Sequence, residues 1–204
     1  AFKVAETFSM LSNLYPGRID LGVGRAPGGE MQVAAALSAP HPPSFREFPQ
    51  QVEELMDYLS GARATPRLSP EPAGAIPIWM LGTSPDSAEL AARLGLPYAF
   101  ALFINPHGTP ALVDHYRQHF RPSAMLAEPY VILATTAFAA DSEQKAELLR
   151  KNYFVNIARL LSGLRDAAGL SPEDTRDHQF TEREAMIIGG QARIAAFGTP
   201  DRGR

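Results

Sequence analysis

The sequence predicts an α/β fold in which a parallel sheet is covered by helices. Short, continuously apolar segments alternate with longer amphipathic segments along most of the chain, and such strands are typical of a sheet that is buried on both faces. The chain has 204 residues, of which 45% are hydrophobic and 20% charged. This composition indicates one globular domain, residues 1–204, with a substantial core.

The spacing of apolar residues alternates between a strand pattern and a helix pattern, and this alternation predicts four βα units. Pro16 and Gly17 interrupt the first amphipathic segment, and the apolar run after them predicts a strand. The predicted strands are Ile19–Val23, Ile76–Leu81, Tyr98–Ile104 and Tyr130–Phe138. The predicted helices, each with an apolar face, are Pro49–Leu59, Ser84–Leu94, Pro110–Phe120 and Ser142–Leu161. Because short connections place successive strands side by side, we expect the four strands to be adjacent and parallel in chain order.

Both ends of the chain have helical patterns. Residues 1–14 predict a helix whose apolar face consists of Phe2, Ala5, Phe8, Leu11 and Leu14. Near the other end, Thr199 as N-cap and Pro200 as first helical residue predict the start of a further helix. We therefore expect the chain to be the middle of a larger protein or a truncated one. Its open strand edges would then be covered by flanking segments or by another chain, which makes a homo-oligomer the expected state.

Two further segments lack a clear period. Residues 26–46 are rich in Gly, Pro, Ala and Ser, and residues 162–190 combine weak periodicity with charge-rich stretches. We expect both to be mobile loops or excursions from the regular elements.

The segment Leu14–Gly29, with the sequence LYPGRIDLGVGRAPGG, carries a candidate anion site. Arg25 stands at the end of the first predicted strand. Gly24 before it and the Pro and Gly residues after it prevent a regular helix, which leaves backbone N–H groups able to meet an anion. A guanidinium at this position suits the geometry of a phosphate.

The segment Leu81–Ser87, with the sequence LGTSPDS, follows another strand and begins a helix. Ser84 fits the N-cap and Pro85 the first helical position. The first N–H groups of this helix, with the hydroxyls of Thr83, Ser84 and Ser87, would face the region beyond the strand. A helix cap and a surface arginine are each ordinary features by themselves. Together, at the ends of two strands, they predict that Arg25 and this helix start converge on one phosphate.

The pattern around Arg25 and the later run from Pro77 to Pro97, PIWMLGTSPDSAELAARLGLP, together resemble the bacterial luciferase-like flavin monooxygenases, in particular their non-luminescent oxidoreductase branch. The resemblance covers Phe2 to about Asp201. It implies a TIM (β/α)8-type barrel, of which this chain would carry about four central βα units, because a whole barrel needs roughly 250 residues. It also implies that Arg25, Thr83, Ser84 and Ser87 surround the flavin phosphate, with Gly24 and Gly82 as further cofactor-binding residues.

The resemblance further implies a reaction. Reduced FMN, supplied by a separate flavin reductase or formed in place, would react with O₂ and oxidise a small organic substrate. Some branches of the family use the deazaflavin F420 instead. The acidic-histidine motif that serves this chemistry on an early strand of family members is absent from this chain, so the catalytic residue stays unknown. A non-catalytic flavin-binding remnant is an alternative. A phosphate-handling isomerase is disfavoured, because no Lys stands in any of the four predicted strands.

Composition and the remaining polar residues exclude other classes. The net charge of −3 gives no footprint for nucleic acid, and the absence of Cys removes disulfide and thiolate chemistry. No apolar run reaches membrane-spanning length, so we expect a cytoplasmic protein without membrane contact.

His115 and His119 lie one helical turn apart, but no third ligand is evident and no metal site is predicted. His107, in the loop after the third strand, is either solvated or near the substrate on the same face as Arg25.

Overall fold

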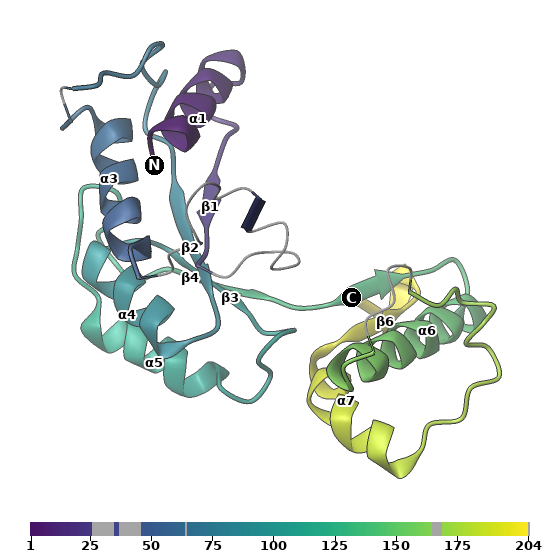
Figure 1. Cartoon of the computed structure of the whole chain (residues 1–204). Helices are drawn as coiled ribbons and strands as arrows, with labels where there is room; N and C mark the ends of the chain where they lie inside the picture. The colour runs from purple at the N-terminus through teal and green to yellow at the C-terminus, as the bar shows by residue number, and fades with distance from the viewer. Residues whose placement is uncertain (26–34, 37–45, 64, 165–168, 204) are drawn as a thin grey trace. The chain divides into compact units, whose positions relative to one another are not determined.

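The chain forms two compact units in the computed structural model, which describes residues 1–25, 35–36, 46–63, 65–164 and 169–203 (Figure 1). Unit 1 comprises Ala1–Phe100 and Thr109–Leu133, and unit 2 comprises Ala101–Gly108 and Ala134–Arg204. Most of the residues 26–46, where we expect a mobile loop, lie outside the described residues. That the two units belong to one partial barrel domain stays a prediction.

The sheet of unit 1 confirms the predicted strand order. Its strands are β1 (Leu21–Val23), β2 (Ile78–Gly82), β3 (Tyr98–Ala101) and β4 (Val131–Ala134), adjacent in that order. The pairs β1–β2 and β2–β3 are parallel, with Leu21 opposite Ile78 and Met80 opposite Tyr98. One face of this sheet forms the core of the unit, because the side chains of Ile78, Met80, Tyr98 and Phe100 are fully buried.

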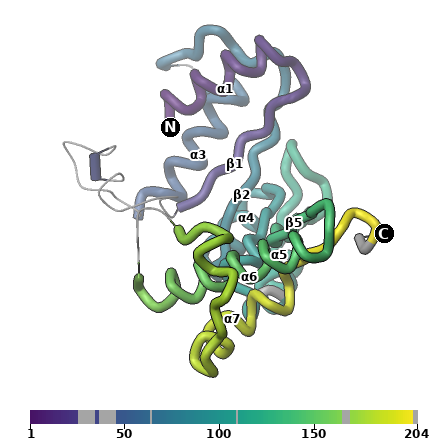
Figure 2. The backbone as a smooth tube through the Cα atoms, turned by 90° about the vertical axis from the view of Figure 1, so that its right-hand side faces the viewer, coloured from purple at the N-terminus to yellow at the C-terminus, as the bar shows by residue number. Residues whose placement is uncertain are grey.

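Helices of unit 1 begin and end close to the predicted positions. They are α1 (Phe2–Leu14), α3 (Phe48–Ser60), α4 (Pro85–Leu94) and α5 (Thr109–His119). Helices α1 and α3 lie side by side (Figures 1 and 2), and the rings of Phe2 and Tyr58 meet edge to face at 5.1 Å. Helix α4 packs against both β2 and α5. The strand–helix alternation therefore places the N-terminus of α4 directly after the carboxyl end of β2.

The buried face predicted for α1 is wrong in part. Leu14 is exposed, whereas Ser9 and Ser12 are buried. Ser9 donates a hydrogen bond to the carbonyl of Pro70, and the amide of Asn13 donates to the carbonyl of Glu71 at 2.7 Å. A hydrophobic pattern cannot indicate such a face, because α1 contacts the segment before β2 through these hydroxyl and amide groups.

Unit 2 contains a second, two-stranded parallel sheet. Strands β5 (Ala137–Ala139) and β6 (Ala196–Gly198) pair with each other, and helices α6 (Glu143–Leu161) and α7 (Glu182–Ile194) precede β6. The core consists of Phe154, Ala158 and Ile188, with the rings of Tyr153, Phe180 and Phe197 packed against it. A 3₁₀ helix at Pro200–Gly203 confirms a helix start at Pro200, although it is not an α-helix. Helix α7 begins within residues 162–190, for which we expect an irregular excursion.

The single predicted strand Tyr130–Phe138 is wrong, because it is divided between the two sheets as β4 and β5. The residues between these strands bond within unit 2. Thr135 donates to the carbonyl of Ile194 at 2.8 Å, and the hydroxyls of Thr136 and Tyr153 are 3.0 Å apart. The strand predicted to end at Ile104 likewise ends early, at Ala101, where the carbonyl accepts the N–H of Ile104 in a turn.

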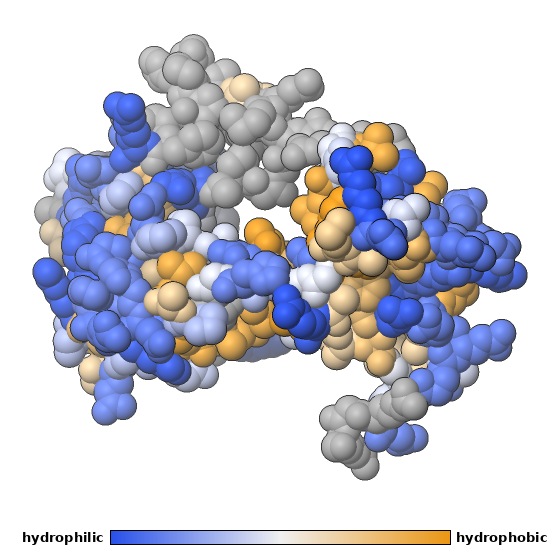
Figure 3. Space-filling view, turned by 90° about the horizontal axis from the view of Figure 1, so that it is seen from below, coloured by the Kyte–Doolittle hydropathy of each residue, from blue (hydrophilic) through white to orange (hydrophobic). Residues whose placement is uncertain are grey.

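Large apolar side chains are exposed in both units (Figure 3). They include Ile132 and Leu133 of β4, Leu160 and Leu161 of α6, and Met186 of α7. Apolar surface of this kind is typical of contacts with further protein, and the homo-oligomer stays a prediction. Among the described residues, no helix is long and apolar enough to cross a membrane, and the cytoplasmic location stays an expectation.

Candidate phosphate site

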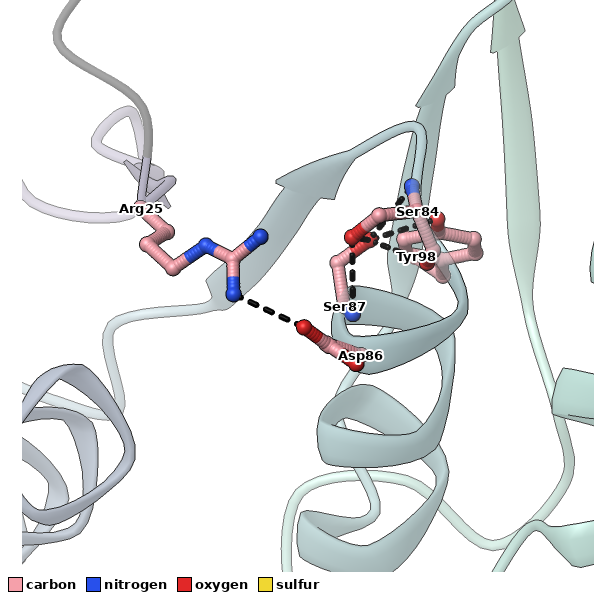
Figure 4. A network of polar contacts seen from close by, with 5 residues as sticks. All are labelled: Arg25, Ser84, Asp86, Ser87 and Tyr98. Carbon is pink, nitrogen blue, oxygen red and sulfur yellow. Dashed lines mark hydrogen bonds and ion pairs between the residues drawn. The ribbon is translucent and has the colours of Figure 1, made fainter. Parts of the chain in front are cut away.

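Ser84 caps helix α4 through a reciprocal pair of hydrogen bonds (Figure 4). The Ser84 hydroxyl accepts the backbone N–H of Ser87 at 3.3 Å, and the Ser87 hydroxyl accepts the backbone N–H of Ser84 at 3.2 Å. Pro85 is the first helical residue. The predicted cap is confirmed, and the sequence Ser-Pro-x-Ser explains it locally, because each serine supplies the acceptor that the other needs.

The hydroxyl of Ser87 connects this cap to the core of unit 1. It donates to the carbonyl of Ser84 at 2.7 Å and lies 3.0 Å from the phenol oxygen of Tyr98 on β3. Tyr98 is fully buried, and this burial raises the pKa of its phenol. The neutral phenol of Tyr98 therefore contacts the Ser87 hydroxyl from the side of the sheet. Tyr98 is a contributor that the sequence motifs do not reveal, since its role depends on β3 lying beside β2.

Glycines at the ends of β1 and β2 allow close packing at this site. A Cβ atom on Gly82 would lie 2.2 Å from the Ser87 hydroxyl oxygen, and one on Gly24 would lie 3.3 Å from the carbonyl oxygen of Leu81. Gly82 therefore leaves the room in which the cap forms. Thr83, which is half-buried, stands between Gly82 and the cap. The six predicted cofactor-binding residues thus lie at the ends of two neighbouring strands and at the start of the helix that follows the second.

Arg25 reaches the first turn of α4, as expected from the sequence. Its Nη1 lies 2.8 Å from Oδ2 of Asp86, the second residue of the helix (Figure 4). The side chains are 46% and 74% exposed, respectively, so the pair lies on the solvent side of the cap. Sequence reasoning missed Asp86, although an acidic residue in a first helical turn is a known partner of the helix dipole.

This arrangement offers an anion two kinds of hydrogen-bond donor, a backbone N–H and a guanidinium. The cap uses the N–H of Ser87, and Pro85 has none, which leaves the N–H of Asp86 as the first-turn donor outside the cap. The guanidinium of Arg25 and the positive end of the α4 dipole lie beside it. The hydroxyls of Ser84 and Ser87, in contrast, are held by the cap. A phosphate at this site would take the place of the Asp86 carboxylate at Arg25.

The other residues singled out in the sequence lie elsewhere. His107 belongs to unit 2, where a Cβ atom on Gly190 of α7 would lie 2.7 Å from its Nε2. A shared face with Arg25 stays a prediction. His115 and His119 are on α5, and Glu89 of α4 lies beside them as a third potential ligand that was not evident from the sequence. The interaction depends on helix packing, which the spacing along one helix does not contain. The absence of a metal site stays a prediction.

A parallel sheet with helices between its strands, and a candidate anion site at the carboxyl ends of two of them, is the arrangement found in α/β barrel proteins. The model of the luciferase-like monooxygenase family matches residues 1–202, and the chain belongs to this family. The fold class, a TIM-type barrel of which the chain carries a part, is confirmed by this match and by a solved relative.

Two relatives and two solved structures illustrate the similarity. The chain is 38% identical to the uncharacterized protein YvbT of Bacillus subtilis, over 97% of this chain and 59% of that protein. It is 43% identical to a luciferase-like monooxygenase of Escherichia coli, over 72% of this chain and 44% of that protein. The chain thus spans about half the length of these curated relatives.

Crystallographic apo-MsnO8 is 30% identical to the chain, with a TM-score of 0.72 over 97% of this chain and 67% of that one. An F420-dependent secondary alcohol dehydrogenase, in complex with an F420-acetone adduct, is 15% identical, with a TM-score of 0.53 over 97% of this chain and 68% of that one. The second likeness concerns the fold alone.

Proposed function

We propose that this chain binds the phosphate of reduced FMN and belongs to an oxidoreductase that uses this flavin with O₂ to oxidise a small organic substrate. The observation that carries the proposal is the position of Arg25 beside the first turn of α4, at 2.8 Å from Asp86. Phosphate sites of barrel enzymes concentrate at the carboxyl ends of the strands, and membership of the luciferase-like monooxygenase family supports the redox chemistry.

Each residue of the site has a defined task in this proposal. The bound flavin supplies the redox chemistry. Arg25 contributes the cation and a planar pair of donors, while the Asp86 N–H and the dipole of α4 contribute a neutral anion site. Ser84, Ser87 and Tyr98 keep the helix start in place through the cap. The catalytic residue stays unknown.

In this proposal the Asp86 carboxylate and the ligand phosphate compete for Arg25. Both side chains are substantially exposed, and an exposed ion pair is worth only about 0–1 kcal/mol. A phosphate dianion, bound by the guanidinium and the helix N-terminus together, can therefore displace this carboxylate at small cost. The pair keeps Arg25 beside the helix until a ligand phosphate replaces Asp86.

Comparison of FMN with riboflavin tests the proposal, because riboflavin lacks the phosphate. Flavin fluorescence is titrated with the purified chain, and F420 is titrated in parallel. Tighter binding of FMN than of riboflavin is expected, and equal affinities would contradict a phosphate site. Binding of F420 in place of FMN would support the F420-dependent alternative.

A second measurement separates an oxidoreductase from a flavin-binding remnant. O₂ uptake and H₂O₂ release are recorded with NADH and a separate flavin reductase as the source of reduced FMN, in the presence of candidate small organic substrates. Free reduced FMN returns the O₂ that it consumes as H₂O₂, so less H₂O₂ per O₂ than with the reductase alone is expected for a monooxygenase, which transfers one oxygen atom to the substrate and releases the other as water. Flavin binding with an unchanged H₂O₂ yield would favour the remnant, an alternative motivated by the share of its relatives, 59% and 44%, that the chain spans.

A further inference from the structure

Helices α4 and α5 bring three metal-binding side chains together on the outside of unit 1. Glu89 comes from α4, and His115 and His119 come from α5, one helical turn apart. One ligand atom of each residue lies within 4.8 Å of the others. The two imidazole rings stack at 4.2 Å, and Nε2 of His115 lies 2.7 Å from Oε2 of Glu89.

The hydrogen bond of His119 fixes which of its ring nitrogens can bind a metal. Its Nδ1 lies 2.9 Å from the backbone carbonyl oxygen of His115. Because a carbonyl oxygen can only accept, Nδ1 carries the proton, and Nε2 of the neutral ring presents its lone pair. A histidine that binds a metal usually donates its other N–H to a carbonyl or a carboxylate in this way. His119 is therefore oriented as a ligand by the helix that carries it.

The contact between Glu89 and His115 provides the other two ligand atoms. A divalent cation between a carboxylate oxygen and an imidazole nitrogen takes the place of the proton that they share. Zinc bonds to nitrogen and oxygen of 2.0–2.2 Å correspond to ligand atoms about 3.4 Å apart in a tetrahedral site. The His115 and Glu89 side chains are 38% and 52% exposed, so both have room to rotate to this spacing.

We propose that Glu89, His115 and His119 bind a Zn²⁺ ion that connects α4 to α5, with water as the fourth ligand. Two imidazoles and one carboxylate form a ligand set that zinc takes in proteins, and two histidines at positions i and i+4 of a helix present their ligand atoms on one face. The ion joins the helix that begins at Ser84 to its neighbour. This inference is independent of the flavin proposal.

Zinc titration of the untagged, chelator-treated chain tests the site by calorimetry, with thermal unfolding in the presence and absence of zinc as a second readout. We expect one zinc ion per chain and a higher Tm with zinc. The variants His119→Gln and Glu89→Gln should each bind zinc ~10-fold or more weakly, since each removes a ligand. The matched control is His178→Gln, because His178 forms a similar pair with Glu184, at 3.2 Å, in unit 2.

The outcomes are decisive in both directions. Loss of zinc binding in both α4–α5 variants, with wild-type affinity in His178→Gln, supports the site. No binding by the wild-type chain, or equal binding by the wild type and by His119→Gln, overturns it, since the ion would then bind elsewhere or not at all. Circular dichroism without metal shows whether each variant is folded, and if His119→Gln is not, Glu89→Gln decides the matter.

Discussion

Nη1 of Arg25 lies 2.8 Å from Oδ2 of Asp86, although the two residues are 61 positions apart in the sequence. The register of the sheet explains the contact. Val23 of β1 is opposite Met80 of β2, so the chain after β1 runs level with the end of β2, where α4 begins. A cation from one strand end thereby lies beside a helix N-terminus that follows the next strand.

Replacement of Arg25 by Ala should weaken FMN binding. Loss of a charge-assisted hydrogen bond corresponds to about 1.5–3 kcal/mol, or roughly tenfold or more in Kd. Fluorescence titration measures the effect, with riboflavin as the ligand whose affinity should not change. The matched control is Arg93→Ala, because Arg93 forms another exposed pair on α4, with Glu53 at 2.8 Å. Equal FMN affinities of wild type and Arg25→Ala would remove Arg25 from the site.

Replacement of Asp86 by Asn should have the opposite effect on FMN. The change removes the carboxylate that competes for Arg25, and a surface pair of about 0–1 kcal/mol corresponds to a gain of up to about fivefold. The same titration measures it, with Glu53→Gln as control, since Glu53 is the partner of Arg93. A weaker affinity would mean that Asp86 positions Arg25 for the ligand instead of competing with it.

Replacement of Ser84 by Ala should reduce stability more than flavin affinity. The Ser84 hydroxyl accepts the N–H of Ser87 in the cap, and loss of such a cap costs about 1 kcal/mol. Urea unfolding measures the stability, and fluorescence titration measures the affinity. A loss of FMN affinity as large as that of Arg25→Ala would show that the hydroxyl itself contacts the ligand.

Replacement of Gly82 by Ala should disrupt the cap from the strand side. The added Cβ would lie 2.2 Å from the Ser87 oxygen, and such overpacking costs about 1–3 kcal/mol. Gly74→Ala is the control, since nothing lies within 4 Å of its added Cβ among the described residues. If urea unfolding gave the same stability for both variants, the close approach of Gly82 to Ser87 would be unimportant.

Glu184 should contribute to stability at neutral pH and lose this contribution in acid. Its carboxylate accepts the backbone N–H of Thr181 at 2.8 Å, and this hydrogen bond, followed by smaller effects of the Thr181 hydroxyl and His178, holds the pKa of Glu184 below its ordinary value. A lowered pKa in the folded state favours folding above the ordinary pKa, and the advantage disappears as the pH falls through the lowered one. Glu184→Gln should therefore flatten the loss of stability in acid, measured by urea unfolding at several pH values. An unchanged pH profile would contradict this.

Local features of the chain could be predicted because neighbouring residues determine them. The cap at Ser84 and Pro85 needs only residues of the same turn, and the strand order follows from the tendency of successive strands to lie side by side in a sheet. The partner of Arg25 could not be predicted, because it depends on the register between β1 and β2. The same holds for Glu89 beside His115, which depends on the packing of α4 against α5.

The division of the segment Tyr130–Phe138 between two sheets could not be predicted from the sequence pattern either. Thr135 and Thr136 are β-branched and favour extended backbone wherever they stand. Their hydroxyls bond to Ile194 and Tyr153, which lie far along the chain. Local propensity predicts strand here, and β4 and β5 flank the two threonines, but it contains no information about which sheet receives each strand.

The start of α4 has two sides that differ in how freely their residues can be substituted. The contact between the hydroxyls of Ser87 and Tyr98 marks the inner side. On the inner side, the cap depends on a buried phenol of the sheet, so a substitution there changes the core and the cap together. On the outer side, Arg25 and Asp86 are in contact with solvent and with each other. A protein engineer, or evolution, can therefore alter the charge offered to a ligand through these two residues without rebuilding the helix start that presents them.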